Sequence, residues 1–178
     1  TPALTAEEAR ELLDSIVEEK KELPQLRDRA IIGVMTYTFA RVSAVCRLNV
    51  GDYFRAGRRW KIRLREKGGQ RRTVPVHHKA QDYLDAYIDR AGIREDRDGP
   101  LFQSLKGRTG ELTGNRLLAD NALQMVKRRA EEAGFDPAQL TCHTFRATGI
   151  TTFLENGGDL ETTQHIAGHA SANTTRIY

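Results

Sequence analysis

The sequence is poor in cysteine, with only Cys46 and Cys142 among its 178 residues. Two cysteines form neither a disulfide framework nor a zinc-binding spacing, which excludes a disulfide-rich secreted domain and favours a reducing compartment. A chain of this length buries roughly 70% of its unfolded surface, so it needs neither disulfides nor a metal to hold a core. We therefore expect a cytoplasmic protein without a metal site or a cofactor.

Long hydrophobic runs are also absent. The most apolar stretch, 30–40, contains two threonines and is too short to span a bilayer. The first twenty residues are acidic and amphipathic, unlike a signal peptide. Because 39% of the residues are apolar and 29% are charged, a membrane protein, a collagen and a disordered tail are excluded. No repeat or linker divides the chain, so we expect one domain over 1–178.

The charge is small overall but unevenly distributed. The net charge is +4, yet nine basic residues lie between Arg55 and Arg72 around a single acid, Glu66. Such segregation is typical of a nucleic-acid-binding face, although a solvated strand pair is the more common explanation of a charged face. The candidate contacts of this stretch with a nucleic-acid backbone are Arg55, Arg58, Arg59, Lys61, Arg71 and Arg72.

Helical periodicity dominates the chain. A capping box, Thr5 with Glu8, predicts a helix over 6–21, and Pro24 begins a second, largely buried helix that runs to about Phe39. Glycines end two further predicted helices. All the later helices are expected over 80–91, 115–133, 142–155 and 160–167, before a short segment over 171–178.

A change of period predicts a β-hairpin between the second and third helices. Trp60, Ile62 and Leu64 alternate with basic residues, a Gly-Gly turn follows Lys67, and 73–76 resumes the strand pattern. Pro75 indicates an edge position or a strand end. The stretch 93–113 is expected to be mostly loop. The predicted fold class is therefore mainly α with a small antiparallel β-sheet.

The residues with the clearest chemistry lie in the C-terminal part of the chain. His143 and Arg146 are three residues apart on a predicted helix, so both project from one face. His169 follows Gly168, and Tyr178 lies nine residues further on. Taken singly, these residues are typical of a solvated helix face, a cap or a terminal aromatic. Their combination at these spacings is much rarer.

With these motifs, the sequence resembles the catalytic domain of tyrosine recombinases, the phage integrase family. Phe39-Ala40-Arg41-Val42-Ser43 resembles the segment with the first arginine of the family, and the hairpin 67–76 resembles the one that carries its lysine. Cys142-His143-Thr144-Phe145-Arg146 resembles the His-x-x-Arg helix. Two C-terminal segments resemble the last motif of the family, which carries its nucleophile. They are Ala167-Gly168-His169 and Thr174-Thr175-Arg176-Ile177-Tyr178. The expected catalytic residues are Arg41, Lys67, His143, Arg146, His169 and Tyr178.

The resemblance implies site-specific cleavage and rejoining of double-stranded DNA through a 3′-phosphotyrosyl intermediate. Two guanidiniums suit the charge that develops on the phosphate, and the family assigns the lysine the role of general acid. It also implies self-association on DNA, as a tetramer of the full-length protein. A DNA-clamping domain before Thr1 and a tail after Tyr178 are expected to be missing. Ala44 stands where the family often has glutamate, which questions the support of Arg41.

Three alternatives remain open. A type IB topoisomerase uses much the same chemistry, and a non-catalytic DNA-binding accessory can share the fold. A metal-dependent nuclease would need carboxylates to converge from Asp120, Asp136, Asp159 or Glu161, which form no tight motif.

Overall fold

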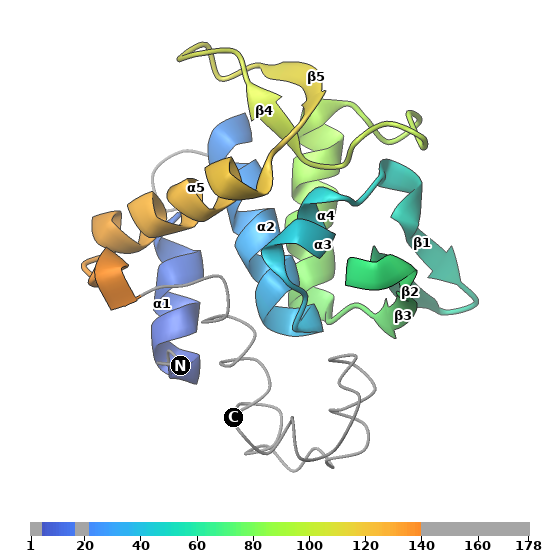
Figure 1. Cartoon of the computed structure of the whole chain (residues 1–178), viewed down its shortest axis with the longest axis horizontal. Helices are drawn as coiled ribbons and strands as arrows, with labels where there is room; N and C mark the ends of the chain where they lie inside the picture. Colours follow the sequence, from blue (N-terminus) through green and yellow to red (C-terminus); the bar gives the residue numbers. More distant parts are fainter. Residues whose placement is uncertain (1–4, 17–21, 140–178) are drawn as a thin grey trace.

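The computed structural model describes residues 5–16 and 22–139 of the chain. This part is mainly helical and carries two small antiparallel sheets (Figure 1). The helices are α1 (Ala6–Ser15), α2 (Leu23–Thr38), α3 (Val42–Cys46), α4 (His78–Ala91) and α5 (Ala119–Glu132), with short 3-10 helices η1 (Val50–Asp52), η2 (Lys67–Gly69) and η3 (Pro137–Gln139). The strands are β1 (Tyr53–Ala56), β2 (Arg59–Arg65), β3 (Arg71–Pro75), β4 (Gln103–Leu105) and β5 (Leu112–Arg116). The elements predicted beyond residue 140 lie outside the described residues.

The first helix begins at its predicted cap. The Thr5 hydroxyl accepts a hydrogen bond from the Glu8 amide, and the Glu8 carboxylate accepts one from the Thr5 amide, each at 3.1 Å. These bonds satisfy amides that have no partner within the helix. The helix ends at Ser15, short of the predicted end at residue 21, and 17–21 lie outside the described residues.

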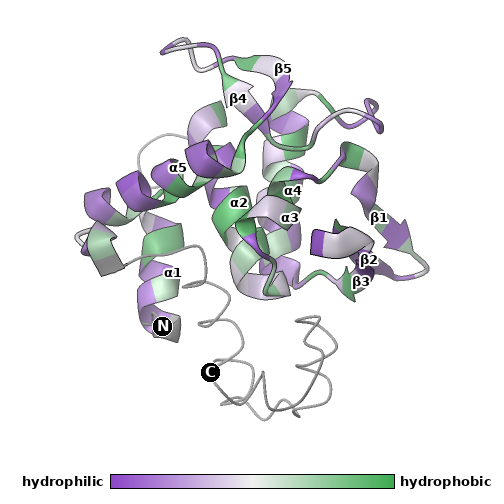
Figure 2. Ribbon diagram, in the orientation of Figure 1, coloured by the Kyte–Doolittle hydropathy of each residue, from purple (hydrophilic) through white to green (hydrophobic). Residues whose placement is uncertain are grey.

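The core is built around α2, which packs along α4 near the centre of the molecule (Figure 1). Most residues of α2 are buried, as its apolar sequence predicted. Gly33 permits the close approach, because a Cβ there would lie 2.7 Å from the ring of Tyr83 on α4. Figure 2 shows hydrophobic residues on α2 and a largely hydrophilic α5 at the edge of the molecule. The packed pair of α2 and α4 therefore forms a rigid support for the connection that follows the C-terminal end of α2.

The larger sheet has the order β1-β2-β3 and contains the predicted hairpin. Ile62 of β2 pairs with Val74 of β3, and both are fully buried, which confirms the alternation read from the sequence. Pro75 ends β3, an edge strand, as predicted. The prediction missed β1, because four residues are too few to show a two-residue period.

The structure of 93–116 adds two details that the prediction lacked. The stretch 93–113 is mostly loop, as expected, but it includes β4 and the start of β5, which pair as a hairpin. The helix α5 begins at Ala119, later than the predicted start at Asn115. The guanidinium of Arg116 explains the later start of α5, since it donates hydrogen bonds to the carbonyls of Cys46 and Leu48, at 2.9 Å each. These distant partners hold the segment extended, and no local pattern reveals them.

Candidate active site

Arg41 lies in the tight connection between α2 and α3. Phe39 ends α2 in the left-handed conformation, with φ 59° and ψ 22°, so the chain turns sharply before Arg41. Arg41 is extended and is the N-cap residue of α3, and its side chain is 47% exposed. A guanidinium held in this way keeps donors available to an anion from outside.

Glu66 places a buried carboxylate beside Arg41. Its side chain is only 8% exposed, and its Oε2 lies 3.6 Å from Nη1 of Arg41. Its Oε1 accepts a hydrogen bond from Nε of Arg72 at 2.9 Å. Arg72 in turn donates to the Thr38 carbonyl at the end of α2, at 3.3 and 3.4 Å. The hairpin is therefore attached to the α2–α3 connection through a carboxylate and two guanidiniums.

Lys67 follows Glu66 directly and begins the turn of the hairpin. The turn is closed by a hydrogen bond of 2.7 Å from the Glu66 amide to the Gln70 carbonyl. Gly68 adopts a φ of 82°, which a residue with a side chain rarely adopts. Lys67 is exposed. The structure thus brings the segment that carries Lys67 next to Arg41, through the neighbouring Glu66.

The basic residues of the hairpin do not share one surface. Lys61 pairs with Pro75 and Arg65 pairs with Arg71. The side chains of Lys61, Arg65 and Arg71 therefore project from the face of the sheet opposite to that of Ile62. Arg59 has the same parity on β2 and is exposed. We call the face formed by Arg59, Lys61, Arg63, Arg65 and Arg71 the outer face of the sheet.

The other three predicted backbone contacts lie elsewhere. Arg58 is exposed in the β1–β2 turn, while Arg55 pairs with Trp60 and donates to the Gly57 carbonyl at 3.0 Å. Arg72 pairs with Leu64 on the core face, and its side chain is only 9% exposed. Burial lowers the pKa of Arg72, and its hydrogen bond to Glu66 opposes that shift. Its guanidinium is engaged within the protein.

Sequence reasoning left Glu66 out of the site and Arg63 and Arg65 out of the DNA contacts. Both arginines contact the buried carboxylate of Asp52, at 3.7 and 3.5 Å, from the outer face. Their alternation with Lys61 was the available signal. For Glu66 the signal was its position as the single acid among nine bases.

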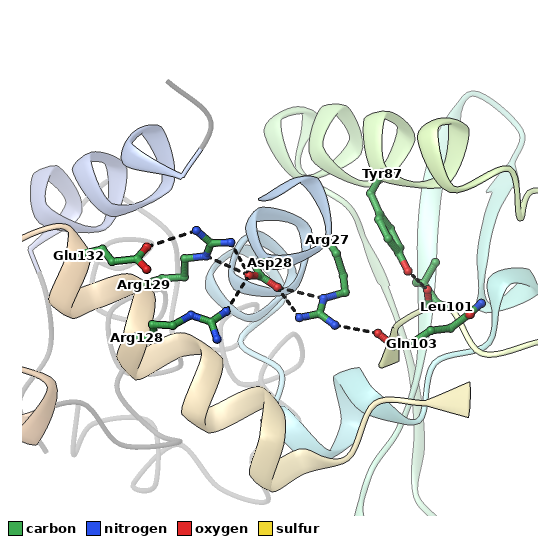
Figure 3. A network of polar contacts seen from close by, with 8 residues as sticks. All are labelled: Arg27, Asp28, Tyr87, Leu101, Gln103, Arg128, Arg129 and Glu132. Carbon is green, nitrogen blue, oxygen red and sulfur yellow. Dashed lines mark hydrogen bonds and ion pairs between the residues drawn. The ribbon is translucent and has the colours of Figure 1, made fainter. Parts of the chain in front are cut away.

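A second buried carboxylate, Asp28, holds the helices together away from this site (Figure 3). Its oxygens lie 2.8 Å from Arg27 and Arg129 and 3.6 Å from Arg128. Arg27 also donates to the Gln103 carbonyl at 2.9 Å. One carboxylate therefore joins α2 to α5 and, through Arg27, to β4.

The other predicted catalytic residues, His143, Arg146, His169 and Tyr178, lie outside the described residues. The described residues contain no cluster of three or more histidine, cysteine or acidic side chains suited to a metal. In the same part of the chain, no helix is both long and apolar enough to cross a bilayer. Burial raises the pKa of the Cys46 thiol to about 11, so this cysteine is not poised as a nucleophile.

Comparison with known proteins decides the family. Residues 2–178 match the phage integrase family. The chain belongs to the phage integrase family. The tyrosine recombinase XerD of Mycobacterium leprae is 34% identical over 178 residues, which cover 99% of this chain and 55% of that protein. The chain spans about half the length of the curated relatives it matches.

Solved structures agree with membership of the phage integrase family. The XerA recombinase has a TM-score of 0.80 at 29% identity, over 100% of this chain and 60% of that one. The XerH site-specific recombinase bound to palindromic difH substrate, in a post-cleavage complex, has a TM-score of 0.79 at 24% identity, over 99% and 48% of the two chains. The predicted tyrosine recombinase catalytic-domain fold is confirmed.

Proposed function

We propose that this chain cleaves and rejoins double-stranded DNA at specific sites, through a 3′-phosphotyrosyl intermediate on Tyr178. The observation that carries the proposal is the contact of Glu66 with Arg41, at 3.6 Å, which brings the Lys67 turn to the first arginine. Family membership supports it, as does the name of the similar XerD protein, a tyrosine recombinase.

The two arginines of the site would hold the phosphate that reacts. Arg41 presents a half-exposed guanidinium, and Arg146 is assigned to the same phosphate by the His-x-x-Arg motif. Each guanidinium offers parallel donors and keeps its charge at any relevant pH. Charge placed before the reaction is typically the largest catalytic contribution, and one such donor is worth about 3–4 kcal/mol.

The remaining residues would move protons and form the covalent bond. The Tyr178 oxygen attacks phosphorus, His143 takes the phenolic proton, and the bond to the 5′ oxygen breaks. Lys67 protonates that leaving oxygen, and His169 donates a hydrogen bond to the phosphate. The phosphotyrosyl bond conserves the energy of the broken phosphodiester, so a 5′ hydroxyl can attack it and reseal the strand without another energy source.

DNA would lie along the outer face of the sheet. Its basic side chains come from adjacent strands and attract the phosphate backbone without reading sequence. Arg58, in the β1–β2 turn, remains a proposed contact beside this face, and Arg55, which pairs with Trp60, remains a proposed contact from the other side of the sheet. Arg72 supports the site from within. Exchange between two duplexes requires self-association on DNA, which we propose to be a tetramer that acts in the cytoplasm.

The test uses a pool of nicked duplexes with randomised cores, in which cleavage beside the nick releases a short strand and traps the enzyme. We expect a covalent adduct with the wild-type chain in EDTA and none with Tyr178→Phe. Sequencing the trapped DNA gives the preferred site. Equal adduct yields from the two proteins would refute the proposal.

The structure speaks against a metal site that combines Asp120 with Asp136, whereas Asp159 and Glu161 lie outside the described residues. Asp120 lies in the first turn of α5 and Asp136 lies beyond its C-terminal end. The part of α5 between Asp120 and the end of the helix is about 18 Å long, too great a distance for one metal ion to bridge. Persistence of cleavage in EDTA tests this point directly. Relaxation of supercoiled plasmids without site preference would favour the topoisomerase instead.

A further inference from the structure

We infer that Glu66 is a positioning residue for Arg41, holding its guanidinium in the direction of the phosphate from the hairpin side. The inference rests on the proposed function and adds a residue to it. It is argued from the two carboxylate oxygens of Glu66, which have different partners.

The first oxygen anchors Glu66 in the fold. Oε1 accepts the 2.9 Å hydrogen bond from Arg72, whose guanidinium also donates to the Thr38 carbonyl. Arg72 lies on the core face of β3, so this bond is protected from water. A charge-assisted hydrogen bond in such surroundings is strong and directional. The orientation of the Glu66 carboxylate is therefore determined before any substrate binds.

The second oxygen is the one directed at Arg41. Oε2 of Glu66 is buried and has no hydrogen-bond partner among the described residues. Nη1 of Arg41 lies 3.6 Å away, which is a charge contact but longer than a hydrogen bond. A buried carboxylate oxygen without a donor is costly, so it attracts the nearest mobile one. A small rotation of Arg41 completes that bond.

Glu66 also removes a repulsion between two guanidiniums. Arg41 is close enough to Arg72 to contribute to the lowering of the pKa of Arg72, after burial. The three side chains together carry one net positive charge. Without the carboxylate, two like charges would face each other, and the half-exposed Arg41 would move into solvent.

The helix α3 supplies no carboxylate to the guanidinium of Arg41. Ala44, one turn after Arg41, is fully buried and ends in a methyl group. The carboxylate beside Arg41 therefore comes from the hairpin, on the residue that precedes Lys67. The same side chain thus sets the position of Arg41 relative to the turn that carries the proposed general acid.

The experiment compares single-turnover cleavage of the nicked duplex pool by wild type, Glu66→Gln and Asp28→Asn. Glu66→Gln keeps the size and one acceptor but loses the charge, and we expect cleavage roughly ten- to hundredfold slower. The dissociation constant for DNA, measured separately, should change far less, because one residue is displaced and the outer face is intact. Asp28→Asn removes another buried carboxylate that binds arginines, so its rate is taken per folded molecule, as measured by circular dichroism. That rate should stay at the wild-type level.

The outcomes are distinct. Absence of an adduct with wild type refutes the proposed function, whereas a wild-type rate in Glu66→Gln refutes the role of Glu66 alone. Equal slowing in folded Asp28→Asn would refute it too, since any loss of buried charge would then suffice. If Glu66→Gln does not fold by circular dichroism, Glu66→Asp replaces it. That variant keeps the charge for Arg72 but withdraws the carboxylate, so a wild-type rate would again overturn the inference.

Discussion

Asp28 shows at the scale of a single residue how much one buried charge can support. Its side chain has no exposed area, and guanidiniums from two helices surround it. Arg27, only 5% exposed, depends on Asp28 for its counter-charge. Removing only the carboxylate leaves an uncompensated buried cation. This lowers the stability more than replacing both charged partners by apolar residues would.

Asp28→Ala should therefore lower the free energy of unfolding by about 3–5 kcal/mol. Urea denaturation followed by circular dichroism measures the change. The matched control is Asp89→Ala, which removes a carboxylate that is 67% exposed and paired with Arg94. That surface pair should cost at most about 1 kcal/mol. Equal losses in the two variants would contradict the role of Asp28.

His77 provides a second test at the residue scale, through pH. Its ring stacks on Tyr37 with centroids 4.4 Å apart, and burial lowers the pKa of His77 below its ordinary 6.5, with help from the neighbouring His78. The unfolded chain then binds more protons than the folded one below about pH 6.5. Stability is accordingly expected to fall slightly as the pH drops through 6.5 toward the folded pKa.

The measurement is an NMR titration of the His77 ring, in wild type and in Tyr37→Ala. Removing the stacked ring exposes the imidazole, so the pKa of His77 should rise in the variant. A wild-type pKa at or above 6.5, or no change in the variant, would show that burial against α2 does not control this histidine.

At the scale of elements, α4 illustrates how local signals define a helix. The Nδ1 of His77 accepts a hydrogen bond from the Lys79 amide at the start of the helix. Gly92 ends it in the left-handed conformation, and its amide returns to the Ile88 carbonyl at 3.0 Å. Such a residue stops the helix while satisfying a free carbonyl.

Gly92→Ala should destabilise the chain by about 1 kcal/mol, because alanine is strained at a φ of 68°. A Cβ there would contact nothing within 4 Å, so the backbone alone accounts for the loss. Gly92→Asn serves as the control and should lose less, since asparagine tolerates this conformation. Thermal unfolding of both variants measures the loss of stability. An equal loss in Gly92→Ala and Gly92→Asn would contradict backbone strain as the cause.

At the scale of the whole molecule, residues of one basic run in the sequence lie on different faces of the sheet. The outer face of the sheet gathers basic residues of β2 and β3, while Arg72 from the same basic run is buried. Binding of DNA on this face releases counterions in proportion to the phosphates that it contacts.

Lys61→Ala should therefore reduce the slope of the logarithm of DNA affinity against the logarithm of salt concentration by about 1. Fluorescence anisotropy with a random duplex at several salt concentrations measures the slope. Arg90→Ala removes the same charge from an exposed position on α4 and should leave the slope unchanged. An identical change in both variants would mean that net charge, not the outer face, governs binding.

Much of the fold was predictable because its signals are local. The capping box at Thr5, the glycine stop at Gly92 and the alternation around Ile62 act over a few residues, and all three are confirmed. The strands β1, β4 and β5 were missed, since short strands depend on distant partners. Arg116 is the clearest case, because the carbonyls that hold it lie far away in sequence.

The sequence by itself determined the family and the identity of the candidate catalytic residues, because these depend on residue types in a fixed order along the chain. Only the tertiary structure decided which of the basic residues face outward and which acid lies beside Arg41. Strand pairing assigns Arg72 to the core face and brings Glu66 to the end of α2. Burial and the distance between two charges arise when separate segments pack together.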